Sequence, residues 1–193
     1  IGALIFLATV LGCRTEDRPA KVAEDFEGTV RSFSLVRHKL ENELSQRLNL
    51  AIPEGVDSFF EAAEAGNWLC VSNKFETFVR QETYGTAIAE LNNELWAPIH
   101  ETLGLYEVWI GWKRDSSLLS MFYTPIVSSM PKGAVYFGGT DYGRFLITAV
   151  NVTTTPPGVF CITQNALADN TYAAHLRAIY RPDIWLPQEK DSV

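Results

Sequence analysis

The carboxyl-terminal third of the chain alternates short apolar runs with turns and helix-like stretches, and this order restricts the fold most. Val135–Phe137 and Phe160–Ile162 are apolar runs of β-prone residues, and each is followed by turn residues. Helix-like stretches come after both runs, over Arg144–Val150 and Asp169–Tyr180. The order strand, turn, helix, strand, helix is typical of a Rossmann-like α/β sheet. A crossover helix between two strands requires them to be parallel, so we predict a short, incomplete parallel α/β unit.

The preceding part of the chain is predicted to form a helical layer. Over Lys21–Leu50, apolar residues recur at steps of three and four and trace one stripe of a long amphipathic helix. A helical hairpin is expected next, with arms Gly55–Ala65 and Trp68–Gln81 joined by a Gly-Asn turn. The remaining expected elements are a helix over 86–104, a short strand or extended linker over 105–112, and a helix over Ser116–Ser129. The predicted organisation is thus residues 1–13 as a signal or membrane segment, 14–130 as the helical region and 131–193 as the α/β unit, in which Asp183–Leu186 would begin a third strand.

Composition and charge indicate a folded chain that does not bind nucleic acid. The 193 residues are 47% hydrophobic and 20% charged, which is typical of a globular chain with a packed core. A formal charge of −7 and a pI near 5.0 provide no clustered basic surface, so binding of DNA or RNA is not expected. Cys70 and Cys161 form either a disulfide or two buried free thiols, and no C-x-x-C motif indicates zinc.

An apolar run opens the sequence and predicts attachment to a membrane. Ile1–Gly12 carries no charge and has the length of the apolar core of a signal peptide, but it is too short to span a bilayer alone. The segment Val10–Cys13 resembles the lipobox of bacterial lipoproteins, which implies that Cys13 is lipidated and becomes the mature N-terminus. The alternative is that Ile1–Gly12 is the tail of a longer transmembrane helix. Either alternative places the protein at a membrane of the bacterial cell envelope.

Polar and glycine residues that follow the two predicted strands define a candidate ligand site. In parallel sheets, ligands bind beyond the carboxyl ends of the strands, where glycines permit close approach and helix N-termini present free N–H groups. The segments Gly138–Arg144 and Thr163–Asn170 would lie side by side at that edge. The candidate ligand-binding residues are Gly138, Gly139, Thr140, Asp141, Gly143, Arg144, Gln164, Asn165 and Asp169. A purely structural turn, with Thr140 or Asp141 capping the following helix, explains the same residues.

The chemistry expected of these residues is recognition of polar groups. Arg144 would contact an anion, whereas Asp141 and Asn165 would recognise hydroxyl or amide groups. The spacing of Gly138 and Gly143 matches a P-loop, but Arg144 and Phe145 replace the Lys and Ser/Thr that such a loop needs. Hydrolysis of a nucleoside triphosphate is therefore disfavoured.

Evidence for other chemistry is weak. Asp141 and Asp169 could act as an acid–base pair or hold a cation, although both also precede predicted helices, where capping is the simpler role. His38, His100 and His175 are isolated and predict no metal site. No cofactor is identified from the sequence.

Two segments of the α/β region, "VYFGGTDYGRF" and "VFCITQNALADNTYAAHLRAIY", carry a resemblance to a known family. They resemble the α/β segment of large, mostly uncharacterised bacterial membrane proteins related to the O-mannosyltransferase-like family. The resemblance covers about residues 131–186 and implies that Gly139 and Asp141 belong to one functional turn, and Asn165 and Tyr172 to a second. This chain lacks the multi-pass membrane region where sugar transfer would be expected.

Three hypotheses for the function follow. The first is a membrane-anchored envelope protein that binds a protein partner or a small ligand, such as a glycan, at the edge of its sheet. The second is a fragment of a glycan-modifying membrane enzyme related to glycosyltransferases, which depends on the family resemblance. The third is a helical scaffold in a membrane complex, which depends on the long predicted helix over Lys21–Leu50.

Overall fold

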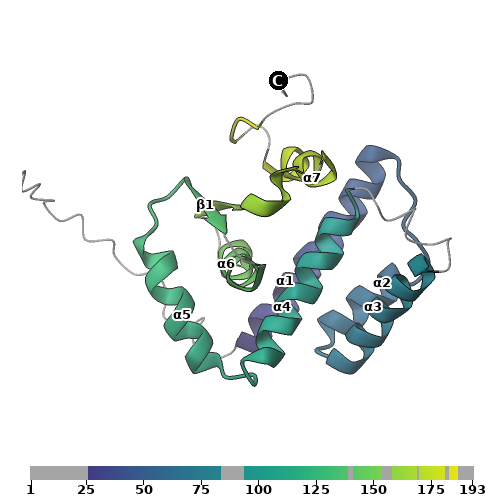
Figure 1. Ribbon diagram of the computed structural model, residues 1–193, viewed down its shortest axis with the longest axis horizontal. Helices are drawn as coiled ribbons and strands as arrows, with labels where there is room; N and C mark the ends of the chain where they lie inside the picture. The colour runs from purple at the N-terminus through teal and green to yellow at the C-terminus, as the bar shows by residue number, and fades with distance from the viewer. Residues whose placement is uncertain are drawn as a thin grey trace, which may run out of the picture.

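The fold is a helical layer joined to a small parallel α/β unit, as predicted. A computed structural model describes residues 26–83, 94–138, 141–153, 158–168, 170–180 and 183–186. The helices are α1 (Phe26–Leu48), α2 (Val56–Glu64), α3 (Trp68–Thr83), α4 (Trp96–Gly111), α5 (Ser116–Ser129), α6 (Asp141–Thr153) and α7 (Asn170–Tyr180), and η2 (Gln164–Ala168) is a short 3₁₀ helix. The strands are β1 (Ala134–Gly138) and β2 (Val159–Thr163) (Figure 1).

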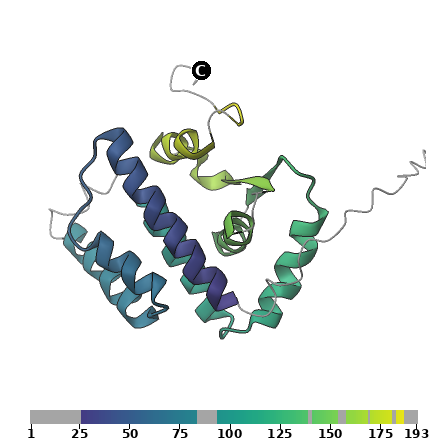
Figure 2. The same cartoon turned by 180° about the vertical axis from the view of Figure 1, so that it is seen from behind.

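Helices α1 and α4 run side by side through the middle of the molecule (Figures 1 and 2). The α2–α3 hairpin packs on one side of this pair, while α6, α5 and the sheet lie on the other. The predicted long helix, the hairpin and the helix over Ser116–Ser129 are confirmed, the last with the same bounds. The long helix and the hairpin were predictable because each has one apolar stripe and one polar face.

The predicted strand or linker over residues 105–112 is wrong, because α4 continues as a helix to Gly111. Neighbouring helices surround α4: it contacts α1, α2, α3 and α6. Its residues from Glu101 to Tyr106 are consequently all buried. A helix that is buried on every side needs no polar face, so the sequence loses the period of 3.6 residues that would identify it.

The sheet confirms the predicted pairing of the two apolar runs. Strands β1 and β2 are parallel, and their register pairs Ala134 with Val159 and Gly138 with Thr163. Helix α6 forms the crossover between them. The predicted third strand over Asp183–Leu186 is wrong, because the N–H groups of Asp183 and Ile184 donate to the carbonyl of Tyr180 and close a turn after α7.

One hydrophobic core extends through both parts of the chain, from Phe26 in α1 to Cys161 in β2. Helix α6 joins the two parts, since it packs against α1, α4 and α5 as well as both strands. Its buried Asn151 also fixes the start of β2: the side-chain amide donates to the Val159 carbonyl at 2.7 Å, and its oxygen accepts from the Gly158 and Val159 N–H groups. The α/β unit is therefore built onto the helical layer.

Candidate functional site

The predicted edge site lies mostly outside the residues that the structure describes. Gly139, Thr140, Asp169 and the proposed lipidation site Cys13 fall outside them, as do the side chains of Asp141 and Asn165. The direct pairing of Gly138 with Thr163 means that the two predicted segments start from adjacent strand ends. The edge site as a whole stays a prediction.

Besides Arg144, the structure describes Gly138, Gly143 and Gln164 of this site, and packing explains the first of them. A Cβ at Gly138 would lie only 2.7 Å from the Cβ of Arg144, so the close approach of α6 to β1 explains this glycine. Gly143 lies half-buried within α6, and Gln164 is exposed on η2. Of these three residues, Gln164 therefore has the side chain that a ligand in solvent would reach.

Arg144, expected to contact an anion at the sheet edge, points into the protein instead. Its side chain is 4% exposed, and its Nη1 donates to Glu101 Oε1 at 3.0 Å. The guanidinium also lies over the Phe145 ring, 3.9 Å from its centroid. The anion that the sequence led us to expect is therefore a carboxylate of the chain itself.

Glu101 binds a second arginine, and together Arg37, Glu101 and Arg144 form what we call the buried ion cluster. Arg37 Nε lies 2.7 Å from Glu101 Oε2, and all three side chains are at most 7% exposed. Burial alone would raise the pKa of Glu101, but the charges of Arg37 and Arg144 outweigh it and hold that pKa below its usual value. The carboxylate is thus ionised at neutral pH and links α1, α4 and α6.

His175 and Tyr172 of α7 lie close to this cluster. His175 is fully buried and its ring nitrogens have no hydrogen-bond partner; burial lowers its pKa to about 4, against the opposing charge of Glu101. Tyr172, a site residue according to the family resemblance, donates its hydroxyl to Thr163 Oγ1 at 3.1 Å and accepts from the Thr163 N–H at 2.8 Å. It therefore holds α7 against the end of β2.

The cysteines in the described part of the chain are free thiols, so the alternative of a Cys70–Cys161 disulfide is excluded. Burial raises the pKa of the Cys161 thiol to about 11, which keeps it protonated and a weak nucleophile. The hydroxyl of Tyr180 pairs with the backbone of Cys161: it accepts from the Cys161 N–H at 3.1 Å and donates to the Cys161 carbonyl at 3.2 Å. Cys161 is therefore a core residue.

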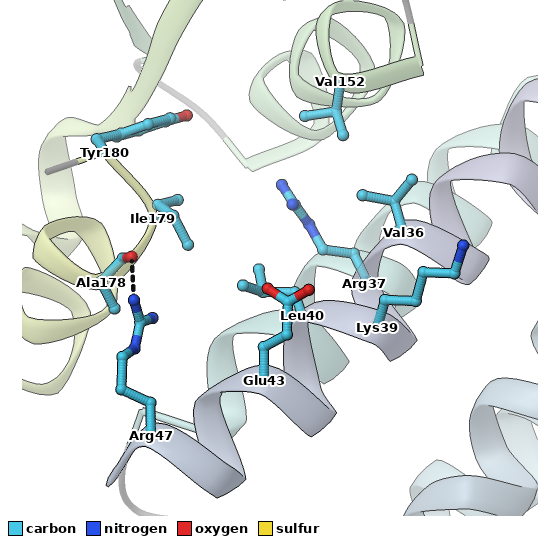
Figure 3. A pocket seen from close by; sticks show the side chains of 10 residues that line it. All are labelled: Val36, Arg37, Lys39, Leu40, Glu43, Arg47, Val152, Ala178, Ile179 and Tyr180. Atoms are coloured by element: carbon cyan, nitrogen blue, oxygen red, sulfur yellow. Dashed lines mark hydrogen bonds between the residues drawn. The ribbon is translucent and has the colours of Figure 1, made fainter. Parts of the chain in front are cut away.

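A groove of about 370 Å³ opens between α1, the end of α6 and the end of α7 (Figure 3). It lies beside the middle of β2, because Tyr180 in its lining bonds to Cys161 there, and not at the predicted edge. Its lining is formed by Val36, Arg37, Lys39, Leu40, Glu43, Arg47, Val152, Ala178, Ile179 and Tyr180. The lining thus combines three cationic side chains and one anionic side chain, all from α1, with a mainly apolar surface.

The cations of the groove differ in their availability. Arg37 points toward the groove in Figure 3 but is bound to Glu101, so its charge is largely compensated. Lys39 and Arg47 are exposed at the rim, and Arg47 Nη1 donates to the Ala178 carbonyl at 2.9 Å. An anionic group at this rim would meet Lys39 and Arg47 first.

Arg37, Glu101 and the groove were not predicted from the sequence. Arg37 occurs on the apolar stripe of α1, four residues after buried Phe33, and a charge in such a position was the available signal. No such signal marks Glu101. Because α4 has no distinct polar face, its sequence does not show which of its polar residues are buried. Within the described ranges, no three potential metal ligands of the His, Cys, Asp or Glu type come together.

Comparisons with protein-family models, curated proteins and solved structures find no match to this chain. The resemblance to the O-mannosyltransferase-like family therefore stays a prediction that depends on the quoted segments alone.

Proposed function

We propose that this protein is a non-catalytic binding protein of the bacterial cell envelope, anchored to a membrane through Cys13. In this proposal, the groove between α1 and α7 binds a small amphiphilic ligand with an anionic head group. The groove itself is the observation that carries the proposal, because its volume of about 370 Å³ is in the range of small-ligand sites.

The chemistry of the lining supports an anionic amphiphile. Lys39 and Arg47 at the rim favour a negatively charged group, and Glu43 is the opposing charge. Val36, Leu40 and Ile179 form an apolar surface next to these cations and favour an alkyl chain. The neighbouring polar groups of the buried ion cluster are engaged in joining helices, which supports binding over catalysis.

Anchoring remains an expectation from the sequence. None of the helices in the described residues is at once long and apolar enough to cross a bilayer.

Isothermal titration of the full chain with octyl phosphate tests the proposed site, with octyl glucoside as the uncharged comparison. We expect octyl phosphate to bind with the higher affinity. Arg47→Ala should weaken it about tenfold, as expected for loss of a charge-assisted contact. The matched control is Lys74→Ala, which removes a cation from α3, where Lys74 bonds to Ser58.

Equal affinities for the two ligands, or equal effects of Arg47→Ala and Lys74→Ala, would contradict the proposed role of the groove. Loss of binding in Lys74→Ala alone would also contradict it, since that residue does not line the groove.

A further inference from the structure

Helix α5 presents an exposed apolar face that no other described element covers. The helix packs inward through Leu119 and Tyr123, which are buried. On its opposite side Leu118, Met121 and Phe122 are 45%, 72% and 38% exposed. Figures 1 and 2 show α5 at the border of the molecule, away from the α2–α3 hairpin. The helix contains no charged residue, which is unusual for an exposed position.

Hydroxyl groups on α5 turn back to their own helix. Ser128 Oγ donates to the Thr124 carbonyl at 2.6 Å, and Ser129 Oγ donates to the Ile126 carbonyl at 2.8 Å. Ser120 and Thr124 also pair through their side chains. Such bonds satisfy hydroxyl groups without water, so these side chains suit an environment of low polarity.

An aromatic side chain extends the apolar face at the start of α5. Trp112 is 40% exposed, and its ring lies 6.3 Å from that of Phe122. We call Trp112, Leu118, Met121 and Phe122 the outer α5 face. Tryptophan is enriched at membrane–water interfaces, where its ring contacts apolar chains while its N–H remains in the polar layer.

Both ends of the outer α5 face carry positive charge. Lys113 is exposed before α5 and Lys132 after it, whereas the guanidinium of Arg114 lies over the buried Trp109 ring, 4.9 Å from its centroid. Asp115 is the nearby acid, and its carboxylate caps α5 by accepting from the N–H groups of Ser117 and Leu118. In a chain of net charge −7, this local excess of cations complements an anionic surface.

The described chain also begins beside α5. The Phe26 N–H donates to Ser116 Oγ at 3.3 Å, and the Phe26 ring lies 6.1 Å from that of Tyr123. Residues 14–25 separate Phe26 from Cys13, a span of at most about 45 Å when fully extended. Under the proposed function, in which Cys13 is anchored, α5 therefore lies beside the point where the anchored segment joins the described fold, within reach of the membrane.

We propose that the outer α5 face lies on the surface of an anionic lipid bilayer, with Lys113 and Lys132 at the head groups. The helix lies along the membrane plane, and its exposed apolar side chains enter the boundary between head groups and acyl chains. This inference rests on the proposed membrane anchoring and specifies which side of the protein faces the lipid. An antiparallel pair of α5 helices from two copies would bring Lys132 of each copy close to Lys113 and Arg114 of the other, which disfavours self-association.

A fluorescent probe at position 121 tests the proposal independently of lipidation. The full chain carries Met121→Cys with Cys13→Ser and Cys70→Ser, so that bimane labels position 121 while Cys161 stays buried. The matched control carries Gln46→Cys, an exposed position of α1, in the same background. We expect phosphatidylglycerol vesicles to shift the emission of the probe at 121 to the blue and to leave that at 46 unchanged. Pure phosphatidylcholine vesicles should have a smaller effect at both positions.

The cationic ends provide a second measurement. Lys113→Ala combined with Lys132→Ala should lower partitioning of the 121-labelled chain onto phosphatidylglycerol vesicles about tenfold. Unchanged emission at 121, or equal shifts in the two lipids, would overturn the proposal. A shift that appears without vesicles and grows with protein concentration would assign the face to a second copy and overturn it as well. Because Cys13 is replaced in every sample, none of these outcomes depends on whether Cys13 is lipidated.

Discussion

Two glutamates, Glu41 and Glu101, are buried on neighbouring helices in opposite protonation states. Glu101 is ionised between two arginines. Glu41 has no hydrogen-bond partner for either carboxyl oxygen. Burial, with a smaller contribution from the charge of Asp57, raises its pKa to about 8. At neutral pH, therefore, α1 buries a protonated acid while α4 buries a carboxylate, and the difference follows from which one has a cation within reach.

Replacing Glu41 should stabilise the protein increasingly as pH rises. Its folded-state pKa of about 8 is above the ordinary 4.5, so the stability it contributes is present below 4.5 and lost as pH rises through 8. Glu41→Met removes this titration, and we expect its advantage to reach on the order of 5 kcal/mol above about pH 8. Denaturant unfolding across this range measures it. Glu43→Met, at an exposed position on the same helix, is the control for introducing a methionine into α1.

Removing the carboxylate of Glu101 should have the opposite effect. Glu101→Leu leaves the buried guanidinium groups of Arg37 and Arg144 without this counter-ion, and we expect a loss of about 3–5 kcal/mol in unfolding free energy. The triple variant Arg37→Met, Glu101→Leu, Arg144→Met removes all three charges and should recover most of it. A triple variant no more stable than Glu101→Leu would contradict this account.

At the level of elements, the segments that apolar periodicity or turn residues mark were predicted correctly from the sequence. A segment without these marks was not. The α2–α3 hairpin, α5 and the parallel β1–β2 pair were predictable because apolar periodicity and glycine turns mark them. Helix α4 was not, because it is enclosed on several sides and has no polar face. The groove depends on side chains from α1, α6 and α7 that meet only in the folded chain.

The packing of α4 against α6 gives a test at this level. A Cβ at Gly104 would overlap the ring of Phe145, and both residues are buried. Gly104→Ala should therefore destabilise the protein by about 1–3 kcal/mol, despite the higher helix propensity of alanine. Gly111→Ala, in the same helix with nothing within 4 Å of the added carbon, is the control and should be neutral or stabilising. Equal thermal shifts for the two variants would argue against close packing at Gly104.

For the whole molecule, the main prediction concerns attachment. We expect Cys13 to be lipidated and the mature chain to begin there, because Val10–Cys13 resembles a lipobox. Mass spectrometry of protein extracted from membranes should find a diacylglyceryl-modified N-terminal peptide. Recovery of intact Ile1–Gly12 on the mature protein would contradict lipidation, whatever the probe at position 121 reports.

The buried ion cluster joins residues 37, 101 and 144, and this spacing has a consequence for the order in which the chain can fold. During synthesis, Arg37 and Glu101 leave the ribosome well before Arg144, so the side of α4 around Gly104 stays uncovered until α6 has been made. Contacts this far apart in sequence also form slowly, because long loops must close first. The nascent helical layer thus remains incomplete until α6 is being translated.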